Sequence, residues 1–238
     1  MERFYNVVEI FVSVEGEGKR SGSLTQFIRL AGCNLHCPYC DTKYAWDTTN
    51  APVIFSKMTS ENIFSALRTD IKNITITGGE PLLSQGISSL IKQLLTNGFH
   101  VNIETNGAVA IAPYQEMQKK TPNGSGTLFF TIDYKLPSSG MEQHMLQENF
   151  LALSSSDVIK FVIASDDDIR AMLHFLQKTK TVYSANKCDM PNIYLGTVWN
   201  AYSAEKLVEW MKKEPLLTDA RLQLQIHKFI WDPEKRGV

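Results

Sequence analysis

The stretch Cys33-Asn-Leu-His-Cys37-Pro-Tyr-Cys40-Asp41-Thr42 carries three of the chain's four cysteines. A glycine directly before it opens the loop, and the proline within it bends the backbone. Closely spaced thiolates on such a loop can turn toward one point and ligate a single metal centre. The stretch therefore predicts a metal-binding loop.

Two kinds of metal centre fit this cysteine spacing. A structural zinc site closes its tetrahedron with four protein ligands, and His36 is the nearest residue that would supply the fourth, since Cys188 lies far away in the sequence. A four-iron cluster held by three cysteines instead leaves one iron without a protein thiolate, which suits a catalytic cofactor. The spacing favours the open four-iron cluster, and zinc is the alternative.

The overall composition limits the classes of protein. The chain has 238 residues with 24 basic and 25 acidic side chains and a formal charge of −1, so we expect no direct nucleic-acid partner. Clustered cysteines do not indicate paired disulfides, and no apolar signal region follows Met1, which predicts a cytoplasmic location. No apolar run of about 18 residues occurs, so no membrane span is expected.

Hydrophobic periodicity divides the chain into alternating strands and helices. The predicted strands cover residues 4–11, 24–30, 74–77, 100–105, 128–135, 157–164, 192–198 and 221–229. The predicted helices cover residues 60–70, 87–95, 165–178 and 203–213. The acidic run at 166–168 has the pattern of a capping box rather than a ligand site, and residues 113–126 are expected to form a loop.

This alternation predicts an α/β fold with parallel strands and right-handed crossovers, curled into an incomplete β/α barrel. The length favours one domain spanning residues 1–238. In closed barrels of this type, reactive groups sit at the carboxyl ends of the strands. Polar motifs follow the predicted strands here at the cysteine loop and at residues 78–80, 104, 133–135, 196–197 and 225–228.

The motif Gly78-Gly79-Glu80-Pro81 follows a predicted strand. It is either an ordinary turn or a place where the backbone approaches a ligand closely, with the Glu80 carboxylate accepting from an ammonium group. Lys135 either extends to solvent or, together with Asp133, binds ribose hydroxyls. Glu104 either caps a turn or binds a ligand, and its position at a strand end favours the second.

A second group of polar residues comes from the two ends of the chain. Val14-Glu15-Gly16-Glu17-Gly18 lacks the helix that a dinucleotide-binding loop requires. Together with Arg29, whose guanidinium suits a carboxylate, and with His227-Lys228, it predicts a pocket for a polar heterocyclic acid. The alternative for Arg29 is a surface ion pair.

Cys-x3-Cys-x2-Cys on a loop after a strand resembles the radical S-adenosylmethionine enzymes, in which a Gly-Gly-Glu-Pro stretch holds the methionine end of the cofactor. The resemblance implies a partial TIM-like β/α barrel of the radical SAM type, a [4Fe-4S] cluster and S-adenosylmethionine. Most of the chain further resembles the 7-carboxy-7-deazaguanine synthase family. The matching stretches are Glu9-Ile-Phe, Glu15-Gly-Glu-Gly18, 29–42, 77–81, Glu104-Thr-Asn-Gly107, Asp133-Tyr-Lys135, Gln225-Ile-His227-Lys228 and Arg236-Gly-Val238.

The resemblance implies a carbon-nitrogen lyase that contracts the ring of 6-carboxy-5,6,7,8-tetrahydropterin to 7-carboxy-7-deazaguanine with loss of ammonia, in queuosine biosynthesis. It also implies Mg²⁺, a homodimer and a flavodoxin- or ferredoxin-type electron donor. One departure is Glu15, where family members usually carry glutamine. The implied roles are cluster binding by Cys33, Cys37 and Cys40; Mg²⁺ binding by Thr42; cofactor binding by Gly79, Glu80, Asp133, Tyr134, Lys135, Gly196 and Thr197; and substrate binding by Val14, Glu15, Gly16, Arg29, Thr77, Glu104, Gln225 and His227.

Two other functions share some of these features. A glycyl-radical-enzyme activating protein has the cysteine spacing but acts on a protein backbone, which leaves the pocket of Arg29, Gln225 and His227 without a purpose. A non-catalytic iron-sulfur or zinc module needs neither the Gly-Gly-Glu turn nor a second pocket. Cys188 is expected to be buried and inert.

Overall fold

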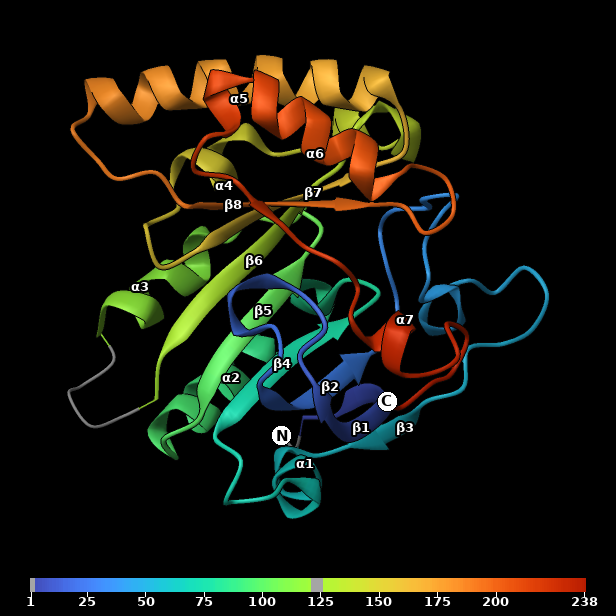
Figure 1. Ribbon diagram of the computed structural model, residues 1–238. Helices are drawn as coiled ribbons and strands as arrows, with labels where there is room; N and C mark the ends of the chain where they lie inside the picture. Colours follow the sequence, from blue (N-terminus) through green and yellow to red (C-terminus); the bar gives the residue numbers. More distant parts are fainter. Residues whose placement is uncertain (1–2, 121–125) are drawn as a thin grey trace.

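The computed structural model describes residues 3–120 and 126–238, and in these residues one nine-stranded sheet forms the centre of the fold (Figure 1). The strand order is β3-β1-β2-β4-β5-β6-β7-β8-β9, with β1 antiparallel to both β2 and β3 and all pairs from β2 to β9 parallel. The strands are β1 Tyr5–Val14, β2 Leu24–Leu30, β3 Ser56–Met58, β4 Asn73–Gly78, β5 His100–Thr105, β6 Leu128–Tyr134, β7 Val158–Ile163, β8 Asn192–Thr197 and β9 Arg221–Leu222. This sheet is the expected partial barrel.

Alternate residues of the central strands face opposite sides of the sheet. On one side, Ile28, Ile76, Ile103 and Phe130 pair in register across four strands, and each is fully buried. On the other side the residues are mostly polar, and they include Thr77 paired with Arg29, Glu104 with Thr131, and Asp133 with Lys160. One face of the sheet therefore supplies the hydrophobic core, and the other supplies a polar interior.

Helices α1 to α6 lie on the apolar side of the sheet, with α5 and α6 over β7 and β8, whereas α7 lies beside β1 and β2 (Figure 1). An aromatic cluster joins Tyr134 of β6 to Phe150, Phe161 and Phe175, with the Tyr134 and Phe175 ring centroids 4.1 Å apart. The helices are α1 Ser60–Ala66, α2 Ile87–Thr96, α3 Ala112–Lys120, α4 Gln147–Leu151, α5 Asp166–Ala185, α6 Ala204–Lys213 and α7 His227–Ile230. No helix among the described residues is long and apolar enough to cross a membrane.

The predicted elements match the structure best where apolar periodicity is strong. The strands 24–30 and 100–105 have the predicted bounds, and Ser165 and Asp168 form the predicted capping box. The loop predicted for 113–126 is wrong over the part that α3 occupies, and residues 121–125 lie outside the described residues. The helix predicted for 60–70 ends at Ala66, the helix predicted to end at 178 continues to Ala185, and the short elements β3 and α4 were not predicted.

The strand predicted for 221–229 is wrong over most of its length. Only Arg221–Leu222 pairs with β8, and the chain then leaves the sheet and forms α7. This segment crosses from the β8 side of the sheet to the β1–β2 edge, where α7 and the C-terminus lie (Figure 1). The backbone N–H of Ile226 donates to the carbonyl of Gly16 at 3.3 Å, so the final segment contacts the loop that follows β1.

Candidate active site

The cysteine loop begins where β2 and β4 end side by side. The N–H of Glu80 donates to the Gly32 carbonyl at 2.7 Å, and the N–H of Gly79 donates to the Leu30 carbonyl at 3.1 Å. A Cβ atom on Gly79 would lie 2.1 Å from the Gly32 carbonyl oxygen, a distance that no side chain tolerates. Glycine at position 79 is therefore what lets the Gly-Gly-Glu turn pack directly against the start of the cysteine loop.

The three thiols of this loop line one cleft, and two of them receive hydrogen bonds from neighbouring N–H groups. The Leu35 N–H donates to Cys33 Sγ at 3.4 Å, and Trp46 Nε1 donates to Cys40 Sγ at 3.3 Å. Burial raises the pKa of the Cys33 and Cys37 thiols, and the Lys135 ammonium opposes that effect at Cys37. Hydrogen-bond donors aimed at sulfur stabilise thiolate ligands, so this donor set fits a cluster held by three cysteines.

Glu80 lies beneath the cleft rather than in its wall. Its carboxylate is 1% exposed and accepts from the Leu82 N–H at 3.0 Å, from Thr105 Oγ1 at 2.9 Å and from the Asn106 N–H at 2.7 Å. Burial raises its pKa to about 7, although these donors lower it. The lining of the cleft includes Gly79 but not Glu80, so the carboxylate connects the ends of β4 and β5 immediately behind the turn.

The side chains of Asp133-Tyr134-Lys135, at the end of β6, lie on opposite faces of the sheet. Lys135 Nζ donates to Asp133 Oδ2 at 2.7 Å, and both residues line the cleft. Asp133 Oδ1 is buried without a hydrogen-bond partner in the described part of the chain, which leaves it free to accept from a ligand. The Tyr134 side chain lies in the aromatic cluster on the opposite face, so only its backbone is near the cofactor residues predicted beside it.

The predicted substrate residues converge on the same cleft from both ends of the chain. Arg29 Nε donates to Glu9 Oε1 at 2.7 Å, so the predicted alternative of an ion pair is present, although both side chains are largely buried. Thr77 Oγ1 donates to Glu104 Oε2 at 2.9 Å. The predicted substrate residues that line the cleft are Val14, Glu15, Gly16, Arg29, Thr77, Glu104, Gln225 and His227.

Two buried glutamates in this group have raised pKa values. Burial and the nearby Glu104 carboxylate raise the pKa of Glu15 to about 8, against the opposing effects of Thr75 and Arg20. Burial also raises the pKa of Glu104, and the Lys160 ammonium opposes this. Burial lowers the pKa of His227, so its imidazole favours the neutral form. The substrate side of the cleft therefore combines carboxylates that readily hold protons with a neutral imidazole.

The cleft as a whole has a volume of about 680 Å³ and places the thiols, the Gly79 turn and the polar pocket in one continuous space. Thr42 also lines it, with Oγ1 3.4 Å from Cys40 Sγ. Among the described residues, no three His, Cys, Asp or Glu side chains form a group that would hold a single metal ion. Cys188 is exposed on the surface, which corrects the expectation that it is buried.

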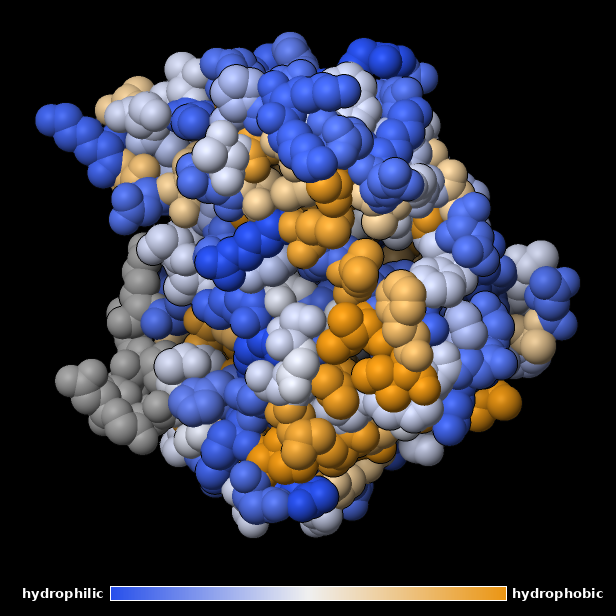
Figure 2. Space-filling model, viewed as in Figure 1, coloured by the Kyte–Doolittle hydropathy of each residue, from blue (hydrophilic) through white to orange (hydrophobic). Residues whose placement is uncertain are grey.

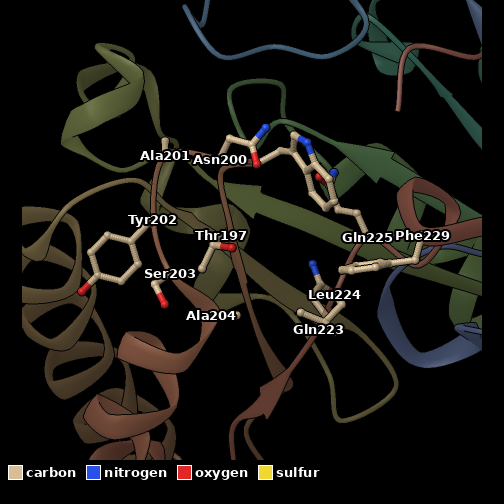
Figure 3. Close-up of a pocket in the computed structure, with 11 residues that line it drawn as sticks. Thr197, Asn200, Ala201, Tyr202, Ser203, Ala204, Gln223, Leu224, Gln225 and Phe229 are labelled. Carbon is tan, nitrogen blue, oxygen red and sulfur yellow. The ribbon is translucent and has the colours of Figure 1, made fainter. Parts of the chain in front are cut away.

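A smaller cavity of about 410 Å³ adjoins the cleft and shares Thr197, Trp199 and Gln225 with it. The Gln223 amide nitrogen is buried there without a partner among the described residues, and its Oε1 accepts from the Gly18 N–H at 3.0 Å. Of the predicted cofactor residues at the end of β8, Thr197 lines this cavity, whereas Gly196 precedes it in the strand and lines neither space. Figure 3 shows the β8–α6 loop with Tyr202 and Ser203 on one side and Gln223, Leu224 and Phe229 on the other.

Sequence reasoning missed several residues that the structure brings to the cleft. Glu17 and Lys160 form an ion pair of 2.5 Å there, and Asp41 Oδ2 accepts from Gln225 Nε2 at 3.3 Å. Lys160 is the one charged residue in the apolar strand Val-Ile-Lys-Phe-Val-Ile, and this was the available signal. A buried strand that carries a single lysine predicts a charged partner facing it.

Comparison with solved structures supports the fold. The crystal structure of QueE from Escherichia coli superimposes with a TM-score of 0.68 and 23% identity over 92% of each chain. The crystal structure of Streptococcus suis SuiB bound to its precursor peptide SuiA superimposes with a TM-score of 0.57 and 12% identity over 81% of this chain and 47% of the other. The 4Fe-4S single cluster domain family matches residues 14–133. The family match, with the three-cysteine loop at the strand ends of the partial barrel, defines the chain as an iron-sulfur protein of the 4Fe-4S single cluster domain family.

Curated relatives identify the family within this class. The 7-carboxy-7-deazaguanine synthase of Clostridium acetobutylicum is 45% identical over 98% of this chain and 99% of its own length. The enzyme of the same name from Chlorobaculum tepidum is 34% identical over 98% and 97%. The chain belongs to the 7-carboxy-7-deazaguanine synthase family.

Proposed function

We propose that this enzyme contracts the ring of 6-carboxy-5,6,7,8-tetrahydropterin to 7-carboxy-7-deazaguanine with loss of ammonia, as a carbon-nitrogen lyase in the pathway to queuosine. The observation that carries the proposal is the single cleft, which joins three free cysteines to a polar pocket built from both ends of the chain. When bound, the [4Fe-4S] cluster and S-adenosylmethionine supply an electron and the radical that removes a hydrogen atom from the substrate. The residues of the chain bind, orient and shield the reactants.

Cys33, Cys37 and Cys40 would hold the cluster, because their sulfurs line the cleft and two of them accept hydrogen bonds from nearby N–H groups. The Gly79 turn would lie along the methionine end of S-adenosylmethionine, with the Glu80 carboxylate behind it. Asp133 Oδ1, buried and unpartnered in the described residues, would accept from a ribose hydroxyl. The cavity beside Thr197 would take the adenine, with the Gln223 amide as an unused donor.

The substrate would occupy the polar pocket between the cysteine loop and the final segment. Arg29 would bind the pterin carboxylate, since its guanidinium is already oriented by the bond from its Nε to Glu9. Glu104 would face the heterocycle from the end of β5, where its Oε2 is fixed by Thr77. The backbone of Val14, Glu15 and Gly16, with Gln225 and His227, would close the opposite side and exclude water.

The test is anaerobic turnover of the reconstituted enzyme with carboxypterin, S-adenosylmethionine, Mg²⁺ and a reduced flavodoxin- or ferredoxin-type donor. We expect 7-carboxy-7-deazaguanine and ammonia, identified by mass and by an ammonia assay. A glycyl-radical-enzyme activating protein would instead cleave S-adenosylmethionine without consuming the pterin. Zinc in place of iron after anaerobic reconstitution would reject the cluster.

We propose that Thr42 is a ligand to Mg²⁺. Its hydroxyl lines the cleft two residues after Cys40, and Mg²⁺ prefers oxygen ligands while keeping several of its waters. One hydroxyl and the substrate carboxylate would therefore suffice. We expect Thr42→Ser to keep Mg²⁺-stimulated turnover and Thr42→Ala to lose most of that stimulation with its iron content unchanged. An unaltered Mg²⁺ response in Thr42→Ala would place the ion elsewhere.

We also propose that the enzyme is a homodimer. Figure 2 shows apolar side chains gathered on the face that carries α7 and the antiparallel strands β1 and β2. The exposed large hydrophobic residues of these elements are Val12, Leu24, Phe229 and Ile230. Such a patch is typical of a protein interface. Light scattering of the parent should give twice the chain mass, and replacing Phe229 and Ile230 by serine should shift the distribution toward monomer.

A further inference from the structure

Lys160 is a cation within the polar interior of the partial barrel. It belongs to β7, and its side chain lines the cleft together with Val162, two residues along the same face. Its Nζ lies 2.5 Å from Glu17 Oε2, with the side chains 15% and 13% exposed. A largely buried ion pair thus joins the central sheet to the loop that follows β1.

Five segments of the chain present groups to this lysine. Burial lowers the pKa of Lys160, but the carboxylates of Glu17, Asp133 and Glu104 outweigh burial and raise it above the ordinary value. Asp41 on the cysteine loop and His227 on α7 also interact with the Lys160 charge. The ammonium therefore stays charged at the point where residues from β5, β6, the cysteine loop and α7 face one another.

Glu17 lies between two backbone contacts that determine the path of its loop. On one side, the Gly16 carbonyl accepts from the Ile226 N–H, and a Cβ at Gly16 would lie 2.4 Å from His227 Nδ1. On the other side, the Gly18 N–H donates to Gln223 Oε1 at 3.0 Å. The neighbours of Glu17 are thus held by the final segment, and Glu17 itself is held by Lys160.

A buried ion pair contributes little net stability, so stability alone does not account for the pairing of Lys160 with Glu17. Replacing a buried ion pair by uncharged groups of similar size is often neutral or stabilising, whereas removing one partner leaves a costly unpaired charge. Lys160 and Glu17 can therefore be removed together as a test of what the pair does beyond stability. The geometry favours a role in placing loop 15–17, which supplies part of the proposed substrate pocket.

We propose that Lys160 is a positioning residue that fixes loop 15–17 through Glu17 and so determines how tightly the carboxypterin is held. The inference rests on the proposed function, because it needs the pterin as the ligand. Among the described residues, the hydrogen bond of Lys160 Nζ goes to Glu17, whereas Asp133 is held by Lys135, so binding of S-adenosylmethionine should depend on Lys160 much less than binding of carboxypterin.

The experiment compares Lys160→Met, Glu17→Gln and the double variant, each as anaerobically reconstituted holoenzyme without reductant. Carboxypterin and S-adenosylmethionine affinities are measured separately, and thermal unfolding is followed on the same samples. We expect Lys160→Met to bind carboxypterin at least about tenfold more weakly and S-adenosylmethionine within about twofold of the parent. The double variant should regain the parent's unfolding temperature but not its carboxypterin affinity.

Lys19→Met is the matched control, because Lys19 Nζ donates to the Ser156 carbonyl outside the cleft, and both affinities should match the parent. Parent-like carboxypterin binding in Lys160→Met would overturn the proposal. Recovery of both stability and affinity in the double variant would show that Lys160 only compensates the Glu17 charge, which would also overturn it. Failure of the parent itself to bind carboxypterin would instead reject the proposed function.

Discussion

Glu15 is a buried acidic residue, and its surroundings explain how a carboxyl group is tolerated there. The side chain is 2% exposed, and Oε2 accepts from Thr75 Oγ1 at 2.6 Å, with Arg20 Nη2 farther away at 3.5 Å. Burial and the Glu104 carboxylate raise its pKa to about 8, so near neutral pH it is mostly protonated. A protonated carboxyl group has one donor and one acceptor side, as the glutamine amide does.

The raised pKa of Glu15 makes stability depend on pH. Between the ordinary value of 4.5 and about 8, the folded protein keeps a proton that the unfolded chain has released, so stability falls as pH rises through this window. Glu15→Gln should remove this loss, on the order of 2 kcal/mol between pH 6 and 8. The check is urea unfolding at both pH values, with exposed Glu205→Gln as control. An identical pH dependence in parent and Glu15→Gln would show that Glu15 is ionised.

At the scale of one element, α5 depends on its first turn. Ser165 Oγ accepts from the Asp168 N–H at 3.2 Å, and Asp168 Oδ2 accepts from the Ser165 N–H at 3.1 Å. Asp168 is fully buried and its other oxygen accepts from the Ser138 N–H at 2.8 Å. Its carboxylate therefore caps α5 and also holds the loop after β6, close to Asp133 and Lys135, for which we propose a role in cofactor binding.

Substitutions in this turn should separate capping from packing. Ser165→Ala should cost about 1 kcal/mol, because it removes one cap. Asp168→Ala should cost more, roughly 2 to 4 kcal/mol, because it leaves several buried N–H groups without acceptors. The exposed neighbour Asp167→Ala is the control, with an expected change within about 0.5 kcal/mol. Chemical denaturation measures all three, and equal losses for Asp167 and Asp168 would contradict the assignment.

At the scale of the whole molecule, the final segment connects the two sides of the partial barrel. Besides the Ile226–Gly16 hydrogen bond, Gln225 donates to Asp41 on the cysteine loop, and the Arg236 guanidinium lies 3.9 Å from the Tyr44 ring centroid. These contacts are few compared with those of the central strands. Ligand binding between the segment and the sheet should therefore strengthen it selectively.

Hydrogen exchange tests this expectation. The exchange rates of the Ile226 and Lys228 amides should fall to about a tenth or less when carboxypterin and S-adenosylmethionine are bound, since local opening then requires ligand release. Amides of the buried residues Ile103 and Phe130 should change little by comparison. Exchange measured by mass spectrometry on anaerobic holoenzyme gives both sets. An equal slowing of exchange at both sets of amides would indicate that the ligands stabilise the whole protein rather than the final segment alone.

The sequence predicted the parallel α/β alternation because strong apolar runs fix local structure, and the strands 24–30 and 100–105 follow these runs directly. It failed at 221–229, where alternating residues favour a strand but β8 offers pairing partners to only two of them. It also failed at 113–126, where a proline and polar residues conceal α3. Tertiary contacts rather than local preference decide such weakly apolar segments.

The sequence by itself determined the chemistry of the site, because the thiol spacing and the Gly79 turn are local features that act through neighbouring residues. Only the tertiary structure decided which distant charges meet. Lys160 pairs with Glu17, which lies far away in the chain, because parallel strand pairing sets β7 beside β6 and brings the loop after β1 over their ends. The register of β6 likewise places the Tyr134 side chain in the core, while the side chains of Asp133 and Lys135 face the cleft. Such pairings depend on how all the strands assemble into one sheet, which no local sequence pattern encodes.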